Sequence, residues 1–405
     1  MHYVGLDWAS ETHDLTIIDD TATIIDRWAF THDEAGITTT LARLAGHDTP
    51  GELPVAIETS NGLLVERLLS AGHPVVPIHP NAFNATRPRW GASRAKTDPG
   101  DSYKLADYLR TEGHRVRRLT LPDQATRDLQ QLVRLRDDHV AAKLACTNQL
   151  AALLARHWPG AGTLFAHLDS PIALAFLADY PTWTSARRLG EARMAQFCRR
   201  HSYSGRRAPA ELLARLRDAP QPAQPAISDT VAAQLVTAQA TLLRSLLGTI
   251  ASLDKATTET TATHPKVTLF AQLPRVGRIH LAQLLAEIGP ILDRAVTLEQ
   301  ACAEAGVTPV TKASGKSLNV GFRYATNTRA RQALTLWADN SRHAAPWAAD
   351  AYRAARRRGK RHPHAVRILA RSWMRVLWAC WEQNAAYDPV RHATARAHHG
   401  APAAA

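Results

Sequence analysis

The sequence predicts an α/β domain with a mixed sheet at the N-terminus, followed by all-α middle and C-terminal regions. Short apolar runs at 3–7, 15–18 and 23–30 follow one another closely, which is typical of an antiparallel meander. After them, helix-like and strand-like segments alternate as far as residue 78. From residue 122 onward, apolar residues recur mainly at helical spacing, which indicates long helices.

The elements of the α/β domain can be assigned in order. Residues 33–46 have apolar residues at helical spacing, and Asp33 is available as the N-cap. Residues 54–57 have the pattern of a short buried strand, 61–71 of a helix and 73–78 of another strand. Strands that are followed by alternating helices and strands indicate a mixed central sheet.

The remaining elements are predicted to be helices with interruptions. Residues 79–97 are polar, basic and contain prolines, which favours a loop, and a helix follows over 99–110. Long helices are expected over 122–157 and around 235–253, the second as a coiled-coil-like arm, while 203–227 break the pattern. We therefore expect four parts, which are an α/β domain (1–120), a helical linker with the arm (121–264), a helical C-terminal domain (265–392) and a disordered tail (393–405).

The composition excludes several classes of protein. A hydrophobic fraction of 45% is ample for packed cores, and no apolar run approaches the ~20 residues of a membrane span. The N-terminus lacks the pattern of a secretory signal. The cysteines stand far apart, which argues against a zinc ribbon or a disulfide framework and favours a cytoplasmic protein; they are Cys146, Cys198, Cys302 and Cys380.

The charge is distributed unevenly along the chain. Lys and Arg number 49 against 36 acidic residues, for a net charge of +13. Residues 1–110 hold 9 basic and 15 acidic residues, a net of −6, so the remainder carries +19. Such an excess predicts a polyanionic partner for the C-terminal part, and nucleic acid is the expected one. Clustered carboxylates that bind a metal would explain the acidic N-terminal part.

Four acidic residues stand where a metal-dependent nuclease needs them. Asp7 ends the first predicted strand, Glu58 ends the fourth, and Asp98 and Asp101 flank a helix start. Ends of adjacent strands meet at one edge of a sheet, and helix positions three apart share a face. The pattern predicts one or two Mg²⁺ (or Mn²⁺) ions held by carboxylate oxygens for phosphodiester transfer. Taken singly, Asp98 or Asp101 is more simply explained as a helix cap.

The predicted acids lie within three short motifs. They are Val-Gly-Leu-Asp-Trp-Ala at 4–9, Ala-Ile-Glu-Thr-Ser at 56–60 and Lys-Thr-Asp-Pro-Gly-Asp at 96–101. Together these motifs resemble the IS110-family transposases. That family, which includes related site-specific invertases, has an N-terminal RuvC-like (RNase H-like) domain with an Asp-Glu-Asp-Asp set. The resemblance implies that the set consists here of Asp7, Glu58, Asp98 and Asp101.

Two C-terminal segments point to nucleic acid. Residues 270–292 contain a Pro-x-x-Gly turn before a helix, as in half of a phosphate-binding helix–hairpin–helix, although an ordinary helical hairpin fits equally well. Residues 353–361 hold six cations, which repel one another without a polyanion nearby. The residues predicted to contact nucleic acid are Lys96, Arg275, Gly277, Arg278, Lys312, Lys316, Arg323, Arg356, Arg357, Arg358, Lys360 and Arg361.

Ser314 is a candidate nucleophile because it lies beside a glycine and between Lys312 and Lys316. On residue chemistry alone, a Ser-Gly turn in a polar loop is the simpler explanation. The Gly-x-x-Pro…Ser-Gly stretch at 306–315 resembles the C-terminal segment of IS110 transposases, which implies that Ser314 attacks a DNA phosphate. The family usually has a second glycine after Ser-Gly, where Lys316 stands here, and Ser317 is not the matching serine.

The resemblance covers about residues 1–158 and 265–390 and implies several partners. The nucleic-acid partners that it implies are donor and target DNA and a structured guide RNA encoded by the element. It also implies that subunits pair (dimer or tetramer) to form a composite site, and that the protein is associated with the bacterial nucleoid. Alternatives are a site-specific DNA invertase, a RuvC-like nuclease in which water is the nucleophile, and a non-catalytic scaffold that binds nucleic acid.

Overall fold

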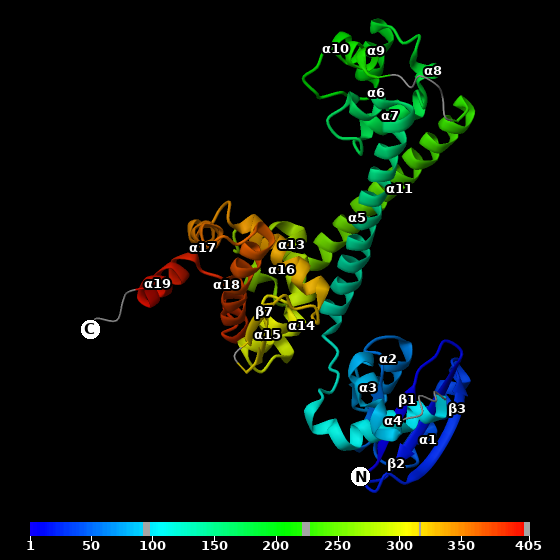
Figure 1. Cartoon of the computed structure of the whole chain (residues 1–405), viewed down its shortest axis with the longest axis vertical. Coiled ribbons are helices and arrows are strands. Elements are labelled where there is room, and N and C mark those ends of the chain that lie inside the picture. The colour runs from blue at the N-terminus through cyan, green and yellow to red at the C-terminus, as the bar shows by residue number, and fades with distance from the viewer. Residues whose placement is uncertain (92–97, 221–226, 316, 401–405) are drawn as a thin grey trace. The chain divides into compact units, whose positions relative to one another are not determined.

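The protein folds into two compact units, Met1–Leu121 and Pro122–Ala405. The computed structural model describes residues 1–91, 98–220, 227–315 and 317–400, without the side chains of Asp98 and 397–400. A mixed sheet with helices comes first and a largely helical remainder follows, which confirms the predicted fold class (Figure 1). Among the helices that the structure describes, none is long and apolar enough to cross a membrane.

The sheet of the first unit has the strand order β3-β2-β1-β4-β5. β1 (Tyr3–Asp7), β2 (Thr12–Ile18) and β3 (Ile24–Thr31) form the predicted antiparallel meander. β4 (Val55–Ile57) pairs with the other side of β1, and β5 (Val75–Pro77) pairs with β4, both in parallel. Because β1 and β4 are parallel neighbours, their C-terminal ends lie at the same edge of the sheet.

Helices cover this sheet and bury their apolar sides against it. α1 (Glu34–Ala45) begins after Asp33, whose carboxylate accepts a hydrogen bond from the Gly36 N–H at 2.7 Å. Leu64, Val65 and Leu68 of α2 join the core on the sheet. The bounds of the remaining helices of this unit are α2 (Leu63–Ser70), α3 (Pro80–Thr86), α4 (Asp98–Glu112) and the short turns η1 (Pro50–Glu52), η2 (Arg87–Trp90) and η3 (Gly113–Arg115).

The prediction of a loop over 79–97 is wrong for its first part. His79 caps α3 by accepting a hydrogen bond from the Asn81 N–H, and Phe83 is fully buried. Phe83 is the one buried residue of α3, and one such residue gives no helical period, so burial by the rest of the fold decides this helix.

α4 lies directly on β1 because residue 5 has no side chain. A Cβ built on Gly5 would fall 1.9 Å from the Ser102 carbonyl oxygen and 2.4 Å from the Ala106 backbone nitrogen. The Ser102 hydroxyl is also buried and lies 2.7 Å from the Thr16 hydroxyl of β2. This close approach fixes the first turn of α4 over the sheet.

The second unit has two separate hydrophobic cores, one at each end of a long helix pair. α5 (Gln124–His157) and α11 (Asp229–Ala262) run side by side as an arm (Figure 1). A helical cluster at one end of the arm packs around Trp158 and Phe176. It consists of α6 (Pro159–Leu164), α7 (Pro171–Asp179), α8 (Trp183–Ala186), α9 (Glu191–Arg200) and α10 (Pro209–Asp218).

The C-terminal core surrounds a cluster of three tryptophans whose rings are tilted against one another. The rings of Trp337 and Trp347 lie 4.6 and 4.4 Å from that of Trp373, whose Nε1 donates to the buried Ser341 hydroxyl. The helices around this core are α12 (Val267–Phe270), α13 (Gly277–Gln283), the π-helix η4 (Leu284–Ile288), α14 (Gly289–Arg294), α15 (Leu298–Glu304), α16 (Thr328–Ser341), α17 (Pro346–Arg357), α18 (His362–Glu382) and α19 (Pro389–Gly400).

Two segments of this unit are helical where the sequence predicts otherwise. α10 lies within the predicted interruption at 203–227, because it buries three leucines against the arm-end core. The predicted disordered tail (393–405) is wrong for 393–400, which continue α19; residues 401–405 lie outside the described part. Asp388 caps α19 and the His392 ring lies edge-on to Trp347, so tertiary contacts hold this helix.

The C-terminal region also contains one strand pair that the prediction of an all-α region omits. β6 (Val310–Ser314) and β7 (Ser317–Gly321) form an antiparallel hairpin with Gly315 in its turn at φ 54°. Nearly every residue of both strands is exposed, so the hairpin leaves no buried-strand pattern in the sequence.

Candidate functional site

Two of the predicted acids lie at the same edge of the sheet. Leu6 of β1 is in register with Ile57 of β4, and the strands are parallel. Asp7 and Glu58 are the next residues along the two strands, so both stand where these neighbouring strands end.

The third acid, Asp101, lies in the first turn of α4 and is 1% exposed. Its carboxylate accepts two hydrogen bonds from the Arg87 guanidinium, at 2.9 and 2.8 Å, and one from Lys104 Nζ at 3.0 Å. Burial alone would raise the pKa of Asp101, but the hydrogen bonds from Arg87 and Lys104 outweigh it and lower the pKa. Asp101 therefore belongs to a buried ion-pair cluster, and its carboxylate accepts these bonds in place of the expected capping bond.

Arg87 pairs with Asp101 and feels the charges of two further predicted acids. Its hydrogen bonds to Asp101 raise its pKa most, burial opposes them, and the charges of Asp101, Glu58 and Asp7 raise the pKa further. The guanidinium also lies 4.8 Å from the centre of the Phe83 ring. The sequence gives no signal for this role, because residue 87 stands in a polar stretch that predicts a loop.

The carboxylates suit a hard divalent cation by their chemistry, but here one of them, Asp101, is paired with Arg87. Among the described side chains, no group of three or more His, Cys, Asp or Glu is arranged to hold a metal ion. The side chain of Asp98, the fourth predicted acid, lies outside the described residues. Oxygen donors at one sheet edge fit Mg²⁺ or Mn²⁺, provided that Asp101 exchanges its cationic partners for the metal.

Two histidines brace the turn that follows Asp7. The Ala9 N–H donates to Nδ1 of the buried His13 at 3.2 Å, which leaves the proton on Nε2 for a 2.7 Å bond to His32. Burial, and then the neighbouring His32, lower the pKa of His13 to about 4. His13 is therefore neutral at physiological pH and acts as a fixed hydrogen-bonding support.

Ser314 is the last residue of β6 in the second unit, and its partner across the hairpin is Ser317. Lys312 lies two residues before Ser314 on the same strand, so both side chains are on one face of the hairpin. Both residues are exposed. Lys316, predicted to flank the serine on the other side, lies outside the described residues, as does Lys96.

The predicted Pro-x-x-Gly turn is present with short helices around it, and its binding of phosphate stays a prediction. Arg275, Gly277 and Arg278 are exposed at the start of α13, with φ of 51° at Arg275 and 54° at Gly277. The preceding helix, α12, has only four residues. The turn is therefore not flanked by two full helices, as a helix–hairpin–helix would require.

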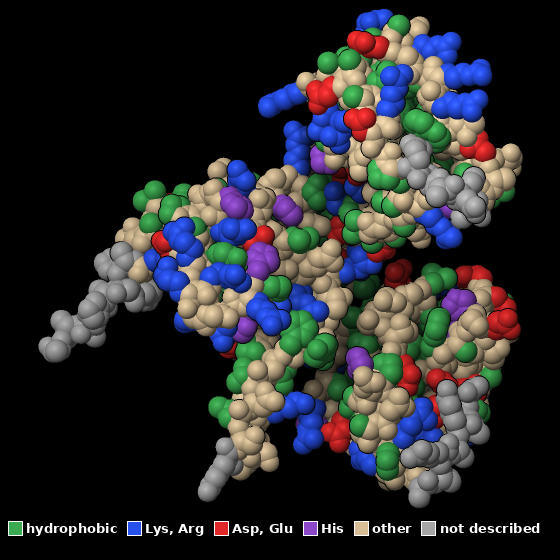
Figure 2. Space-filling model, turned by 45° about the horizontal axis from the view of Figure 1, so that its top comes forward, with side chains coloured by type: hydrophobic (Ala, Val, Ile, Leu, Met, Phe, Trp, Pro, Cys, Tyr) green, Lys and Arg blue, Asp and Glu red, His purple; other side chains and the backbone are tan. Residues whose placement is uncertain are grey.

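The predicted basic run is a surface feature. Arg356 and Arg357 end α17, Arg358 caps it, and Lys360 and Arg361 lead into α18. All of them are exposed. Figure 2 shows many Lys and Arg side chains over this part of the second unit.

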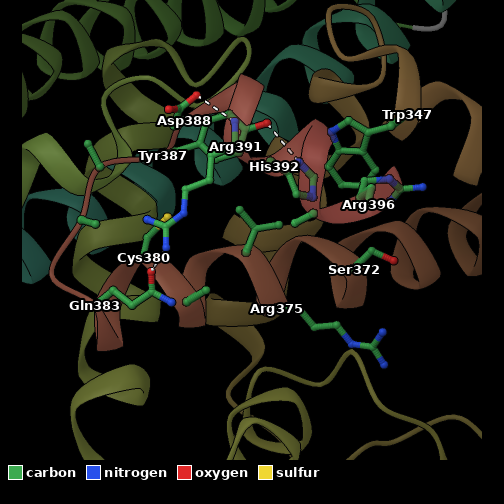
Figure 3. A pocket seen from close by; sticks show the side chains of 15 residues that line it. Trp347, Ser372, Arg375, Cys380, Gln383, Tyr387, Asp388, Arg391, His392 and Arg396 are labelled. Atoms are coloured by element: carbon green, nitrogen blue, oxygen red, sulfur yellow. Dashed lines mark hydrogen bonds between the residues drawn. The ribbon is translucent and has the colours of Figure 1, made fainter. Parts of the chain in front are cut away.

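A cavity of about 850 Å³ lies between α18 and residues 385–396, and none of the predicted site residues lines it. Arg396 lies 4.8 Å from the Trp347 ring on one side of it, and Arg391 donates to the Gln383 side chain on the other. Arg375 extends away from Trp347 and Arg396 (Figure 3). Sequence reasoning missed Arg367, Arg371 and Arg375, although their spacing of four residues places them on one face of α18.

Comparisons with known proteins match both ends of the chain. Residues 4–159 match a family described as transposase, and residues 267–353 match the transposase IS116/IS110/IS902 family. The IS117 mini-circle protein of Streptomyces coelicolor, whose name designates it a transposase, is 34% identical over 96% of both chains. The 42 kDa protein of insertion element IS900 from Mycobacterium paratuberculosis is 27% identical, over 96% of this chain and 97% of its own. Since the likeness extends over nearly the whole length of both chains, this protein belongs to the IS110 family of transposases and is a DNA-processing enzyme.

Proposed function

We propose that this transposase cuts and rejoins DNA through a covalent intermediate on Ser314. The serine oxygen attacks a DNA phosphorus, the bond from phosphorus to one deoxyribose oxygen breaks, and that oxygen leaves with a proton as a DNA hydroxyl. Attack by another DNA hydroxyl on the serine phosphodiester reverses the step and restores the serine. The observation that carries this proposal is the exposure of Ser314 at a hairpin tip with Lys312 on the same face.

We further propose that Asp7, Glu58, Asp98 and Asp101 hold Mg²⁺ or Mn²⁺ for this reaction. A bound ion of this kind stabilises negative charge on the phosphate and assists the attacking and leaving oxygens. The common sheet edge of Asp7 and Glu58, and the place of Asp101 at the start of α4, support this role. Arg87 and Lys104 keep Asp101 ionised until it exchanges their hydrogen bonds for the metal.

The nucleic-acid partners proposed are donor and target DNA and a structured RNA encoded by the element. The exposed residues Arg275, Arg278, Lys312 and Arg356–Arg358 support contacts with a phosphate backbone of either kind. The serine belongs to one unit and the acids to the other. We propose that a dimer or tetramer supplies the composite site, which light scattering of the nucleic-acid complex would test.

Nicked duplexes that span the element's ends test the serine intermediate on denaturing gels. Wild-type protein forms a protein–DNA adduct, Ser314→Ala loses it while still binding DNA, and the matched variant Ser317→Ala keeps it. Asp7→Asn and Glu58→Gln lose the adduct in the presence of Mg²⁺. Free DNA ends without any adduct would contradict the proposal and favour a nuclease that uses water. If the protein purified without RNA still selects its DNA ends, the guide RNA is excluded.

A further inference from the structure

A second cavity, of about 560 Å³, lies between the base of the β6–β7 hairpin and one face of α18. Its cationic lining residues come from both sides of the cavity, and no Asp or Glu is among the described residues that line it. The charged and titratable lining residues are Arg323, His364, Arg367, Arg371 and Arg375.

Arg367 is a partly buried cation beside another cation. The guanidiniums of Arg331 and Arg367 lie 4.7 and 4.8 Å from the centre of the same Phe322 ring. Burial, and then the charge of Arg331, lower the pKa of Arg367. Arg367 makes no ion pair or hydrogen bond with the residues that the structure describes. A desolvated cation in this position is unfavourable unless an anion joins it.

The neighbouring arginines add to the positive potential. Arg367, Arg371 and Arg375 lie one turn apart along α18 and span about 12 Å. Like charges at this spacing repel, and only Arg371 has a carboxylate partner among the described residues, Glu299 at 3.0 Å. Burial and the charges of Arg367 and Lys360 lower the pKa of His364 at the same cavity.

We propose that this cavity binds a backbone phosphodiester of the DNA strand that Ser314 attacks. The hairpin supports the assignment, because Pro309, Gly321 and Phe322 line the cavity while Ser314 lies at the tip. Four residues of strand separate base and tip, about 13 Å, which corresponds to roughly four nucleotides of duplex. The proposal rests on the proposed function because it names Ser314 as the attacking residue. Binding of the phosphate in the cavity itself involves no reaction.

Salt titration of binding to a 30-base-pair duplex, with Ser314→Ala protein to prevent reaction, tests the cavity directly. Arg367→Ala weakens binding roughly tenfold and lowers the salt slope by about one, because one phosphate contact is lost. Arg367→Lys keeps the slope. Glu299→Gln, which frees Arg371, tightens binding, whereas the same charge change at the exposed Glu191 of α9 leaves it unchanged.

A matched removal of one positive charge elsewhere distinguishes phosphate binding in the cavity from general electrostatic attraction to DNA. Arg193→Ala removes an exposed cation from α9, and an effect as large as that of Arg367→Ala would overturn the proposal. The proposal is also overturned if Arg367→Ala weakens the binding of an RNA hairpin alone, or the binding of inorganic phosphate alone at constant ionic strength. Once the adduct position is mapped, single methylphosphonates locate the phosphate. The one near the fourth nucleotide weakens binding by Ser314→Ala protein but not by the Ser314→Ala/Arg367→Ala double variant. The loss of the adduct in Ser314→Ala is measured in a separate experiment. The serine intermediate and the phosphate-binding cavity can therefore each fail without the other.

Discussion

At the scale of single residues, the N-terminal site contains a buried acid held by two cations. Asp101 is almost fully buried, and its two partners, Arg87 and Lys104, satisfy the charge that burial would otherwise penalise. The Arg87 charge also acts on Asp7 and Glu58. Arg87 therefore places a positive charge next to the buried Asp101 carboxylate.

Replacing Arg87 with Gln is expected to have two opposite effects. The first unit loses about 2 kcal/mol of stability, because Asp101 keeps only Lys104 as a charged partner. Mn²⁺ binding, measured by electron paramagnetic resonance, tightens about tenfold or more, because a competing cation is gone. The matched variant Arg89→Gln, in an exposed arginine that pairs with Glu112, changes neither quantity. Unaltered Mn²⁺ affinity in Arg87→Gln would show that Arg87 does not compete for these acids.

His13 gives the first unit a defined pH dependence. Its pKa falls from 6.5 in the unfolded chain to about 4 in the fold, so its stabilising effect is complete above pH 6.5. That stability, on the order of 3 kcal/mol, is lost as the pH falls from 6.5 to about 4. Pulse proteolysis in urea at pH 4.5–7.5, with fragments assigned by mass, measures this loss. His13→Gln removes this part of the slope, and an unchanged slope in that variant would assign it to other groups.

At the scale of elements, the contact of α4 with β1 positions Asp101. Gly5→Ala places a methyl group against backbone atoms of Ser102 and Ala106, which no side-chain rotation relieves. We expect a loss of about 3 kcal/mol or more and a displaced α4. Thermal unfolding followed by circular dichroism measures it, with Gly51→Ala as control, since nothing lies within 4 Å of a Cβ there. Equal melting temperatures for the two variants would mean that α4 shifts without cost.

The exposed β6–β7 hairpin shows a different relation between sequence and element. Backbone pairing defines it, while its apolar residues Leu318 and Val320 remain 70% and 58% exposed. An element of this kind buries little surface of its own, so it suits a role in contacting a partner.

At the scale of the whole molecule, the excess of positive charge belongs to the second unit. The basic run at Arg356–Arg358 is exposed, in contrast to the partly buried Arg367 in the cavity. Replacing all three of its arginines with Ala lowers the slope of log affinity for duplex DNA against log salt by about 2.7, because each released phosphate contributes about 0.9. The triple Lys variant keeps the charge and the slope. A triple Ala variant with an unchanged slope would remove this run from the DNA interface.

The sequence by itself determined what depends on local pattern. Apolar periodicity defined the meander, the alternation up to residue 78 and the long helices, and the charge difference between the two parts indicated nucleic acid. The short motifs around Asp7, Glu58 and Asp101 identified the family, which the full-length relatives confirmed. These features can be predicted from the sequence because each depends on residues close together in the chain.

Only the tertiary structure decided which distant residues meet. Arg87 reaches Asp101 through a helix that the sequence does not predict, and Phe322 brings Arg331 and Arg367 together. The edge-on ring contact between Trp347 and His392, which holds α19, likewise joins residues far apart in the chain. Such contacts follow from packing, hydrogen bonding and burial in the complete fold, and no local period in the sequence encodes them.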